Sequence, residues 1–425
     1  MITRLIFFFG LLFASASHAA EMVNVEYIHN TIQNRWGITV PYNPSLTNPR
    51  VAANMKYLLT AVDRANEIIN DKDVTNHGDN PNFATLAAAD TVATNDAIDR
   101  LIQQPFIMTT TADTTVFSFE LSAQGKFFIT WGDGTTQTIT RTDTKFQTYS
   151  HTYARAGEYK IGMSGRATGY STADPRTEPT AAIRFWKNNN LAGIQGSLGA
   201  IFGTIGNGAN QSQQPIFHNL FRECKNLTTP IPGELFVGVH GAPAERMFAG
   251  AFQNSPFSGS IPPELFADIQ GAPAWAMLNN TFNSSELSGP IPPELFSGIK
   301  GAPAEYMYSG TFMHCQNLTG PLPAKLFGDI RGAPAEYMYY GVLGSCAGIT
   351  GQIPENMFGD LSGPAAEWMF YQSFKDSTGL TGPSARINGK YLYELWPDGT
   401  ANASTGCYQN ATGLSDYDTM PAAWK

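Results

Sequence analysis

Apolar and polar positions recur with a long, regular period between Ile231 and Pro383. Five copies of one phrase begin at Ile231, Ile261, Ile291, Leu322 and Ile353, so successive copies start 30 or 31 residues apart. Each copy carries an apolar-Pro start, a Phe five residues on, a Gly-(Ala/Pro)-(Pro/Ala)-Ala phrase and a Met. A fixed period in this range is typical of a solenoid, in which each unit buries its apolar face against its neighbours.

The copy at Ile291 shows which elements the pattern predicts. Pro292 and Pro293 suit the first turn of a short helix that runs to Ile299. Gly301 breaks that helix, and Pro303 begins a second one. The segment 318–322 is predicted to be extended. The repeat is therefore expected to be of the α/β type.

Three apolar columns are predicted to form a continuous core ladder, because side chains at equivalent positions stack on their copies. They are Met247, Met277, Met307, Met338 and Met369; Phe236, Phe266, Phe296, Phe327 and Phe358; and Phe252, Phe282, Phe312, Leu343 and Phe374.

Two neighbouring columns vary and are expected at the surface. They are Glu245, Trp275, Glu305, Glu336 and Glu367, and Arg246, Ala276, Tyr306, Tyr337 and Trp368. Because Tyr and Trp dominate recognition hot spots, Tyr306, Tyr337 and Trp368 are candidate ligand contacts. The alternative is that the rings only shield the packing between repeats, and the sequence leaves both open.

A column of small hydroxyl side chains is a second candidate surface. It holds Ser258, Ser288, Thr319, Thr350 and Thr381. These residues are predicted to line one edge of a parallel β ladder, where small hydroxyls suit a flat polar surface for a peptide or glycan. A ladder without any ligand is the alternative.

The rest of the chain divides into segments of different character. Residues 21–104 are expected to be mainly helical, with an apolar stripe at helical spacing that begins at Met55. Residues 105–170 contain five β-type runs separated by turn residues. Residues 171–189 are predicted to be a linker, 190–383 the repeat region and 384–425 a capping segment.

Motifs in the β-rich segment carry a family resemblance. Residues 131–135 read Trp-Gly-Asp-Gly-Thr, and His151, Tyr153, Gly157 and Tyr159 follow at the spacing His-x-Tyr and Gly-x-Tyr. This segment resembles a PKD-type immunoglobulin-like domain, which implies a small β-sandwich in which these residues are structural. A catalytic Asp133–His151 pair is disfavoured, because the motif supplies no nucleophile and no third, orienting group.

The repeats carry a second resemblance. The phrase Leu-(Ser/Thr)-Gly-x-(Ile/Leu)-Pro resembles leucine-rich repeats, and Met-Phe followed by Phe-x-x-Cys-x-x-Leu-Thr resembles the BspA-like surface repeats of bacteria. The resemblance implies a cell-surface or secreted protein of adhesion type, with no catalytic residues to carry over. The predicted fold class is thus multidomain: a helical N-terminal segment, a small PKD-like β-sandwich, and an α/β leucine-rich-repeat-like solenoid of about 30-residue repeats.

The N-terminal residues indicate export. Residues 1–20 combine Arg4, an apolar run from Leu5 to Phe13 and small residues at Ser17 and Ala19, as in a cleaved signal peptide. We therefore expect a cell-surface, periplasmic or secreted protein with no membrane span.

Composition narrows the partners. The formal charge is −9, only 14% of the residues are charged, and there is no basic run. These features disfavour nucleic acid and anionic membranes as binding partners. A protein or glycan on host or neighbouring cells remains the expected partner.

An exported chain would place its four cysteines in an oxidising environment. They are Cys224, Cys315, Cys346 and Cys407. The first three lie three residues before Leu227, Leu318 and Ile349, and the same count places Asn254, Ser284 and Ser377 at that position in other copies. A Cys315–Cys346 bridge between adjacent repeats is possible. Buried free thiols acting as small apolar fillers are the alternative.

No catalytic, cofactor or metal motif emerges. The seven histidines show no zinc-type spacing, and the acidic loop around Asp73 lacks the calcium-loop pattern. The function favoured is a non-enzymatic binding protein. A structural envelope or spacer protein, and the accessory binding part of a polysaccharide-degrading enzyme, are the alternatives.

Overall fold

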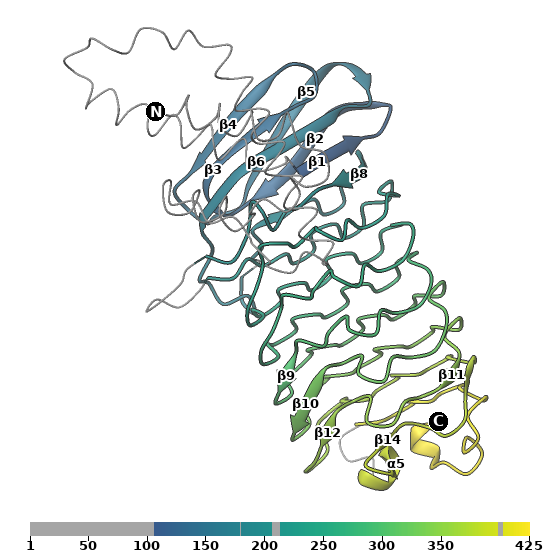
Figure 1. Ribbon diagram of the computed structural model, residues 1–425. Coiled ribbons are helices and arrows are strands. Elements are labelled where there is room, and N and C mark those ends of the chain that lie inside the picture. Colours follow the sequence, from purple (N-terminus) through teal and green to yellow (C-terminus); the bar gives the residue numbers. More distant parts are fainter. Residues whose placement is uncertain (1–105, 179, 206–212, 398–402) are drawn as a thin grey trace, which may run out of the picture. The chain divides into compact units, whose positions relative to one another are not determined.

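The computed structural model describes residues 106–425 except 179, 206–212 and 398–402 (Figure 1). Residues 106–425 form one compact unit. The predicted signal peptide, 1–20, and the predicted helical region, 21–104, lie outside the described residues. No helix in the described part of the chain is long and apolar enough to cross a membrane.

The first part of this unit consists of two antiparallel sheets. One sheet has the order β4-β3-β6-β1-β8 and the other the order β5-β2-β7. The strands are β1 (Phe106–Thr110), β2 (Thr114–Leu121), β3 (Gln124–Thr130), β4 (Thr136–Arg141), β5 (Gln147–Gly157), β6 (Lys160–Gly169), β7 (Ile183–Arg184) and β8 (Leu191–Gln195).

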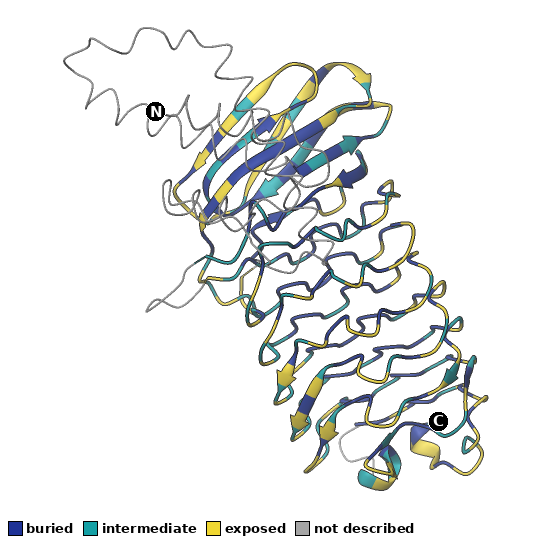
Figure 2. Cartoon of the chain, in the orientation of Figure 1, coloured by how far each residue is buried: buried dark blue, intermediate teal, exposed yellow. Residues whose placement is uncertain are grey.

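Side-chain alternation explains why these strands pack as layers. Along β3, Gly125, Phe127 and Ile129 are buried, while Lys126 and Phe128, which alternate with them, are half-buried. Figure 2 shows the same alternation of buried and exposed positions along most strands of the two sheets. A period of two places one apolar face of each sheet inward.

The second part is built from the repeats and contains only short elements. Its strands are β9 (Lys300–Gly301), β10 (Asp329–Gly332), β11 (Gly351–Gln352), β12 (Asp360–Leu361), β13 (Leu380–Thr381), β14 (Arg386–Ile387) and β15 (Lys390–Tyr391). Beyond the repeats lie the four-residue helix α5 (Leu392–Leu395) and the 3₁₀ turn η4 (Ala422–Trp424).

The fold class predicted from the sequence is wrong. Regular secondary structure in the described residues is almost entirely β, and α5, which lies outside the five repeats, is the one α-helix among them. The two helices predicted per repeat, for example 292–299 and the segment from Pro303, are series of turns instead. An α/β solenoid of the leucine-rich-repeat type is therefore not what these repeats form.

Backbone hydrogen bonds give the physical reason. Within one repeat, Met277 N–H donates to the carbonyl of Ala274, and Asn279 N–H donates to that of Ala276. Each intervening N–H donates to the next repeat, as Leu278 does to Met307 at 3.1 Å. An α-helix needs every N–H to reach the carbonyl four residues back. Here half of them bind a neighbouring repeat.

This turn series has a period of four. Ala276, Asn280 and Ser284 all have left-handed backbone, with φ of 50°, 54° and 56°. Between them, pairs such as Met277 and Leu278 are buried. The equivalent segment of every repeat follows the same course, and we call it the turn coil: residues 245–255, 275–285, 305–315, 336–346 and 367–377.

The predicted core columns are confirmed. All five residues of the Met column are at most 1% exposed, and the two other columns are at most 4% exposed. Rings stack from repeat to repeat, as Phe252 does on Phe282 at 5.4 Å and Phe282 on Phe312 at 5.6 Å between centroids. Stacked copies thus make one continuous apolar ladder.

Two short parallel ladders flank the turn coils. One joins β9, β10 and β12. The other runs through bridges such as Gly289–Leu318 and Gly320–Ile349 to the pair β11 and β13. At this second ladder the glycines 289, 320 and 351 have φ between 82° and 87°, a conformation that costs a residue without a Cβ little.

The core of the two sheets continues into the repeats. Phe185, directly after β7, stacks on Phe221 at 5.4 Å and contacts Phe106 at 6.3 Å. Its N–H donates to the carbonyl of Leu220. The segment predicted as a linker, 171–189, therefore includes a strand of the second sheet and a ring of the shared core.

Candidate functional site: an aromatic strip on the turn coils

Six aromatic side chains form a connected strip on the outer side of the turn coils. They are Trp275, Tyr306, Tyr337, Tyr340, Trp368 and Tyr371, and all are half-buried. Tyr306 and Tyr337 stack at 4.5 Å with an interplanar angle of 7°, and Tyr340 and Tyr371 stack at 4.9 Å. We call this set the aromatic strip.

The strip brings together the three aromatic residues predicted from the sequence. Trp368 lies 6.3 Å from Tyr337, nearly parallel to it, and 4.5 Å from Tyr371, edge to face. At the other end Trp275 meets Tyr306 edge to face at 6.2 Å. Tyr340 and Tyr371 were not among the predicted contacts. Their signal was a third varying column, Ala249, Asn279, Ser309, Tyr340 and Tyr371.

Three of the six strip residues sit on strained backbone. Tyr306, Tyr337 and Trp368 have φ of 57°, 54° and 55°. Bulky residues rarely adopt this left-handed conformation, which Gly, Asn and Asp tolerate better. The turn coil fixes φ at this position, because Arg246 and Ala276 adopt it too.

Carboxylates line the strip. Glu305, Glu336 and Glu367 each precede a strip residue and are exposed. The Trp368 indole N–H donates to Glu367 at 2.7 Å. The pKa of Tyr306 is raised, first by burial, then by Tyr337, and also by Glu336 and Glu305. The strip is therefore both aromatic and negatively charged.

The end of the strip at Trp275 also carries positive charge, because two arginine side chains contact the Trp275 ring. The guanidinium carbon of Arg246 lies 4.9 Å from the ring centroid, and that of Arg176 lies 5.0 Å from it. Arg176 also forms a 2.6 Å ion pair with Glu245. No pattern in the sequence pointed to Arg176, which lies in the turn before β7.

The predicted hydroxyl column is exposed and continuous. Ser258, Ser288, Thr319 and Thr350 are all exposed on the ladder that ends at β11 and β13. The backbone N–H groups of Ser288, Thr319 and Thr350 donate to the previous repeat, as Thr319 does to the carbonyl of Gly289 at 2.9 Å. Thr228 and Ser415 extend the column at its two ends, since their N–H groups bind Ala192 and Gly382. None of the hydrogen bonds and ring contacts in the described ranges joins this column to the aromatic strip.

The residues of the Trp-Gly-Asp-Gly-Thr motif form hydrogen bonds with one another and with the nearby His151 and Tyr153. His151 Nε2 lies 2.7 Å from Asp133 Oδ2, and the Thr135 hydroxyl donates to Asp133 Oδ1 at 2.6 Å. Trp131 stacks on His151 at 4.9 Å, and the buried Tyr153 hydroxyl donates to the Trp131 carbonyl at 2.9 Å. The hydrogen bonds from Thr135 and His151 hold the pKa of Asp133 well below its usual range. This geometry anchors a loop.

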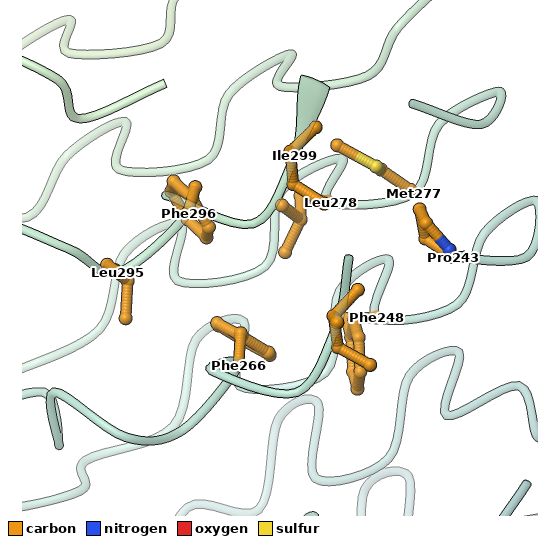
Figure 3. Close-up of a pocket in the computed structure, with 9 residues that line it drawn as sticks. Pro243, Phe248, Phe266, Met277, Leu278, Leu295, Phe296 and Ile299 are labelled. Carbon is orange, nitrogen blue, oxygen red and sulfur yellow. The ribbon is translucent and has the colours of Figure 1, made fainter. Parts of the chain in front are cut away.

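A small gap inside the repeats offers no polar chemistry. Its nine lining residues include Phe248, Met277 and Phe296, and none carries an ionisable side chain (Figure 3). The gap lies between core ladder residues of successive repeats. A packing imperfection of the ladder accounts for it.

Three of the four cysteines, Cys224, Cys315 and Cys346, donate internal hydrogen bonds. All four are buried and free, so Cys315 and Cys346 are not bridged. Cys315 Sγ donates to the carbonyl of Phe282 at 2.9 Å, and Cys346 Sγ to that of Phe312 at 3.0 Å. Burial raises the pKa of Cys315 to about 11. A buried, protonated thiol that donates to the preceding repeat is structural.

One sequence alignment needs correction at this position. Asn254 and Ser284 do not share the position of the cysteines. Ser255 does instead, since its hydroxyl donates to the carbonyl of Phe221 at 2.5 Å. Ser285 contacts Cys315 Sγ at 3.5 Å. The repeats that hold these serines are one residue shorter before the next Leu or Phe, which shifted the count.

Across the described ranges, no group of three or more His, Cys, Asp or Glu side chains is placed to hold a metal ion. Comparison with known proteins finds no matching family model, and no curated protein or solved structure with significant similarity. The PKD-like and BspA-like resemblances therefore rest on the motifs alone.

Proposed function

We propose that this protein is an exported, non-enzymatic repeat protein of adhesion type that binds another macromolecule through the aromatic strip. The observation that carries the proposal is the strip itself: six aromatic side chains in unbroken contact along one outer face. Export is part of the proposal because residues 1–20 have the pattern of a signal peptide.

Sister repeats argue against a purely structural role for the rings. At the position of Tyr306 two other repeats place Arg246 and Ala276, with the same backbone conformation. At the position of Tyr340 three others place Ala249, Asn279 and Ser309. Because the turn coil folds alike without aromatic residues there, stacking between repeats does not require them.

Ring orientation favours a protein partner over a glycan. A sugar stacks on the open face of an aromatic ring, but Tyr306 and Tyr337 cover each other at 4.5 Å, and Tyr340 and Tyr371 do so at 4.9 Å. Ring edges, hydroxyls and carboxylates remain for a ligand. Such amphipathic anchors are typical of protein interfaces.

A binding screen against matrix proteins, cell-surface proteins and glycans tests the proposal. The full chain is compared with the variant Tyr306→Ser/Tyr337→Ser/Trp368→Ser. We expect wild-type capture of at least one protein, weakened at least about tenfold in the variant, because hot-spot truncations cost about 2 kcal/mol or more.

A matched control is Phe146→Ser/Trp186→Ser, which removes aromatic surface from the sandwich side. It should capture as the wild type does. Unchanged capture by the strip variant, with an unfolding transition showing that it is folded, would remove the strip from the function.

A further inference from the structure

Arg176 shows what kind of group the strip surface holds. Its guanidinium pairs with Glu245 at 2.6 Å and lies 5.0 Å from the Trp275 ring. Glu245 and Trp275 occupy the same position in two successive repeats. A carboxylate on one repeat and a ring on the next thus grip one guanidinium, which combines an ion pair with a cation–π contact.

The same two ingredients recur further along the stack. Glu305, Glu336 and Glu367 continue the position of Glu245. The rings beside them are Tyr306, Tyr337 and Trp368. In the described part of the chain no salt bridge reaches any of these three carboxylates. Each of the last three repeats therefore presents a carboxylate and a ring side by side, although here the ring stands one position after the carboxylate, whereas Trp275 occupies the carboxylate's own position.

Charge and spacing indicate which kind of ligand would fit these carboxylates and rings. Neighbouring strands of a ladder are about 4.8 Å apart, so Glu305, Glu336 and Glu367 form a row of like charges roughly 5 Å apart. Cations placed along the row would relieve this repulsion. From Glu305 to Glu367 is roughly 10 Å, which an extended peptide covers in about three residues.

We infer that the acidic aromatic strip, Glu305 to Trp368, binds an extended, arginine-bearing segment of a partner protein, and that Arg176 occupies the first position of the same site. This inference rests on the proposed function and adds the chemistry of the partner. The segment runs along the stack, and its guanidinium groups meet the carboxylates while its stems lie on the edges of the rings.

A fluorescent peptide in which arginine alternates with serine tests the inference by anisotropy on the full chain. A peptide with glutamine in place of every arginine is the ligand control. We expect saturable binding of the arginine peptide only. Glu305→Gln/Glu336→Gln/Glu367→Gln should weaken it at least about tenfold, since charge-assisted contacts are lost.

A charge-matched variant separates the site from the general charge of the protein. Glu234→Gln/Glu286→Gln/Glu294→Gln removes three carboxylates outside the strip and should bind as the wild type does. Equal weakening in both variants, or none in the strip variant, would overturn the inference.

Arg176→Gln supplies a second readout. It frees Glu245 and Trp275 for the ligand, so binding of the arginine peptide should tighten by about twofold or more, as an added charge-assisted contact predicts. Unchanged or weaker binding contradicts the shared-site model. If the arginine peptide does not bind but the screen still finds a partner lost in Tyr306→Ser/Tyr337→Ser/Trp368→Ser, the proposed function stands and this inference fails.

Discussion

In both the two sheets and the repeat stack, backbone N–H and C=O groups form hydrogen bonds between neighbouring segments. The two regions differ in which segments pair. In the sheets, β1 pairs with β8, more than 80 residues away along the chain, and β2 pairs with both β5 and β7. In the stack each turn coil pairs with the next copy of itself. The sandwich is specified by many unique contacts, and the stack by one contact repeated.

Because the stack repeats one contact, it shows more clearly than the sandwich which residues the fold requires and which are available for function. Five copies share the same backbone, so each position has its own internal comparison. Where Met307 lies, every copy has Met, but where Tyr306 lies, the copies differ. Variation on a fixed backbone marks the aromatic strip as dispensable for folding. The sandwich offers no such internal comparison.

The largest expected effect comes from breaking the shared contact of the stack. Met307→Asp puts a carboxylate at a fully buried position, and burying an unpaired charge typically costs several kcal/mol. Hydrogen exchange should show lost protection in the adjoining repeats too, because stability comes from neighbouring interfaces.

The exposed Glu305→Lys is the control for Met307→Asp, and its thermal unfolding should shift by only about 0.5 kcal/mol or less. Equal, small shifts in the two variants would reverse the assignment of inside and outside.

The junction between the two regions should respond to pH. Burial, followed by the charges of Arg246, Arg184 and Arg222, lowers the pKa of His218 from 6.5 to about 4. As pH falls from 6.5 to 4 the unfolded chain takes up a proton that the folded chain does not, so folding stability declines across that window.

At about 1.36 kcal/mol per pH unit, the interval between 6.5 and about 4 corresponds to roughly 3 kcal/mol at its lower end. Urea unfolding of the wild type and His218→Asn at pH 7 and pH 4 measures it. The variant should lose clearly less stability than the wild type. Parallel losses would mean that His218 is protonated in the folded protein.

A smaller effect should stay within the sandwich. Tyr153→Phe removes the 2.9 Å hydrogen bond from the buried hydroxyl to the Trp131 carbonyl, at a cost of about 1 kcal/mol. Because sandwich contacts are unique rather than repeated, exchange rates in the repeats after Ile261 should not change. Faster exchange there would show that the two regions unfold as one.

The smallest effect should come from exchanging one internal donor for another. Cys315→Ser keeps a donor to the carbonyl of Phe282, as Ser377 Oγ, at the equivalent position, donates to the carbonyl of Leu343 in the preceding repeat at 2.9 Å. The midpoint of thermal unfolding should shift by less than the equivalent of about 1 kcal/mol. Thiol titration should find all four cysteines reactive once the chain is denatured, and fewer would reveal a disulfide.

Local pattern was sufficient for part of this fold. Alternating apolar residues predicted β-type runs that became β2 to β6, since a strand records its buried face at every second residue. The period of the repeats located the Met and Phe columns of the core. The helix predictions were wrong because Pro at the start and Gly at the end of a segment fit a turn coil as well as a helix. Which of the two forms depends on the carbonyl to which each N–H donates.

For the candidate site, the sequence identified Tyr306, Tyr337 and Trp368 as outer residues of the repeats. It did not show that their faces are closed by stacking, nor that Tyr340 and Tyr371 join them. The sequence did not indicate Arg176, because it lies outside the repeats and meets Glu245 only in the folded protein.

The sequence by itself determined the period of the stack, the identity of its buried columns and the varying positions on its surface, because these depend on residue type at a fixed spacing. Tertiary structure alone decided that every second N–H in a turn coil binds the next repeat, that the four buried cysteines stay unbridged, and that an arginine before β7 meets a tryptophan in the repeats. Each of these depends on which segments meet in space, which residue spacing does not encode.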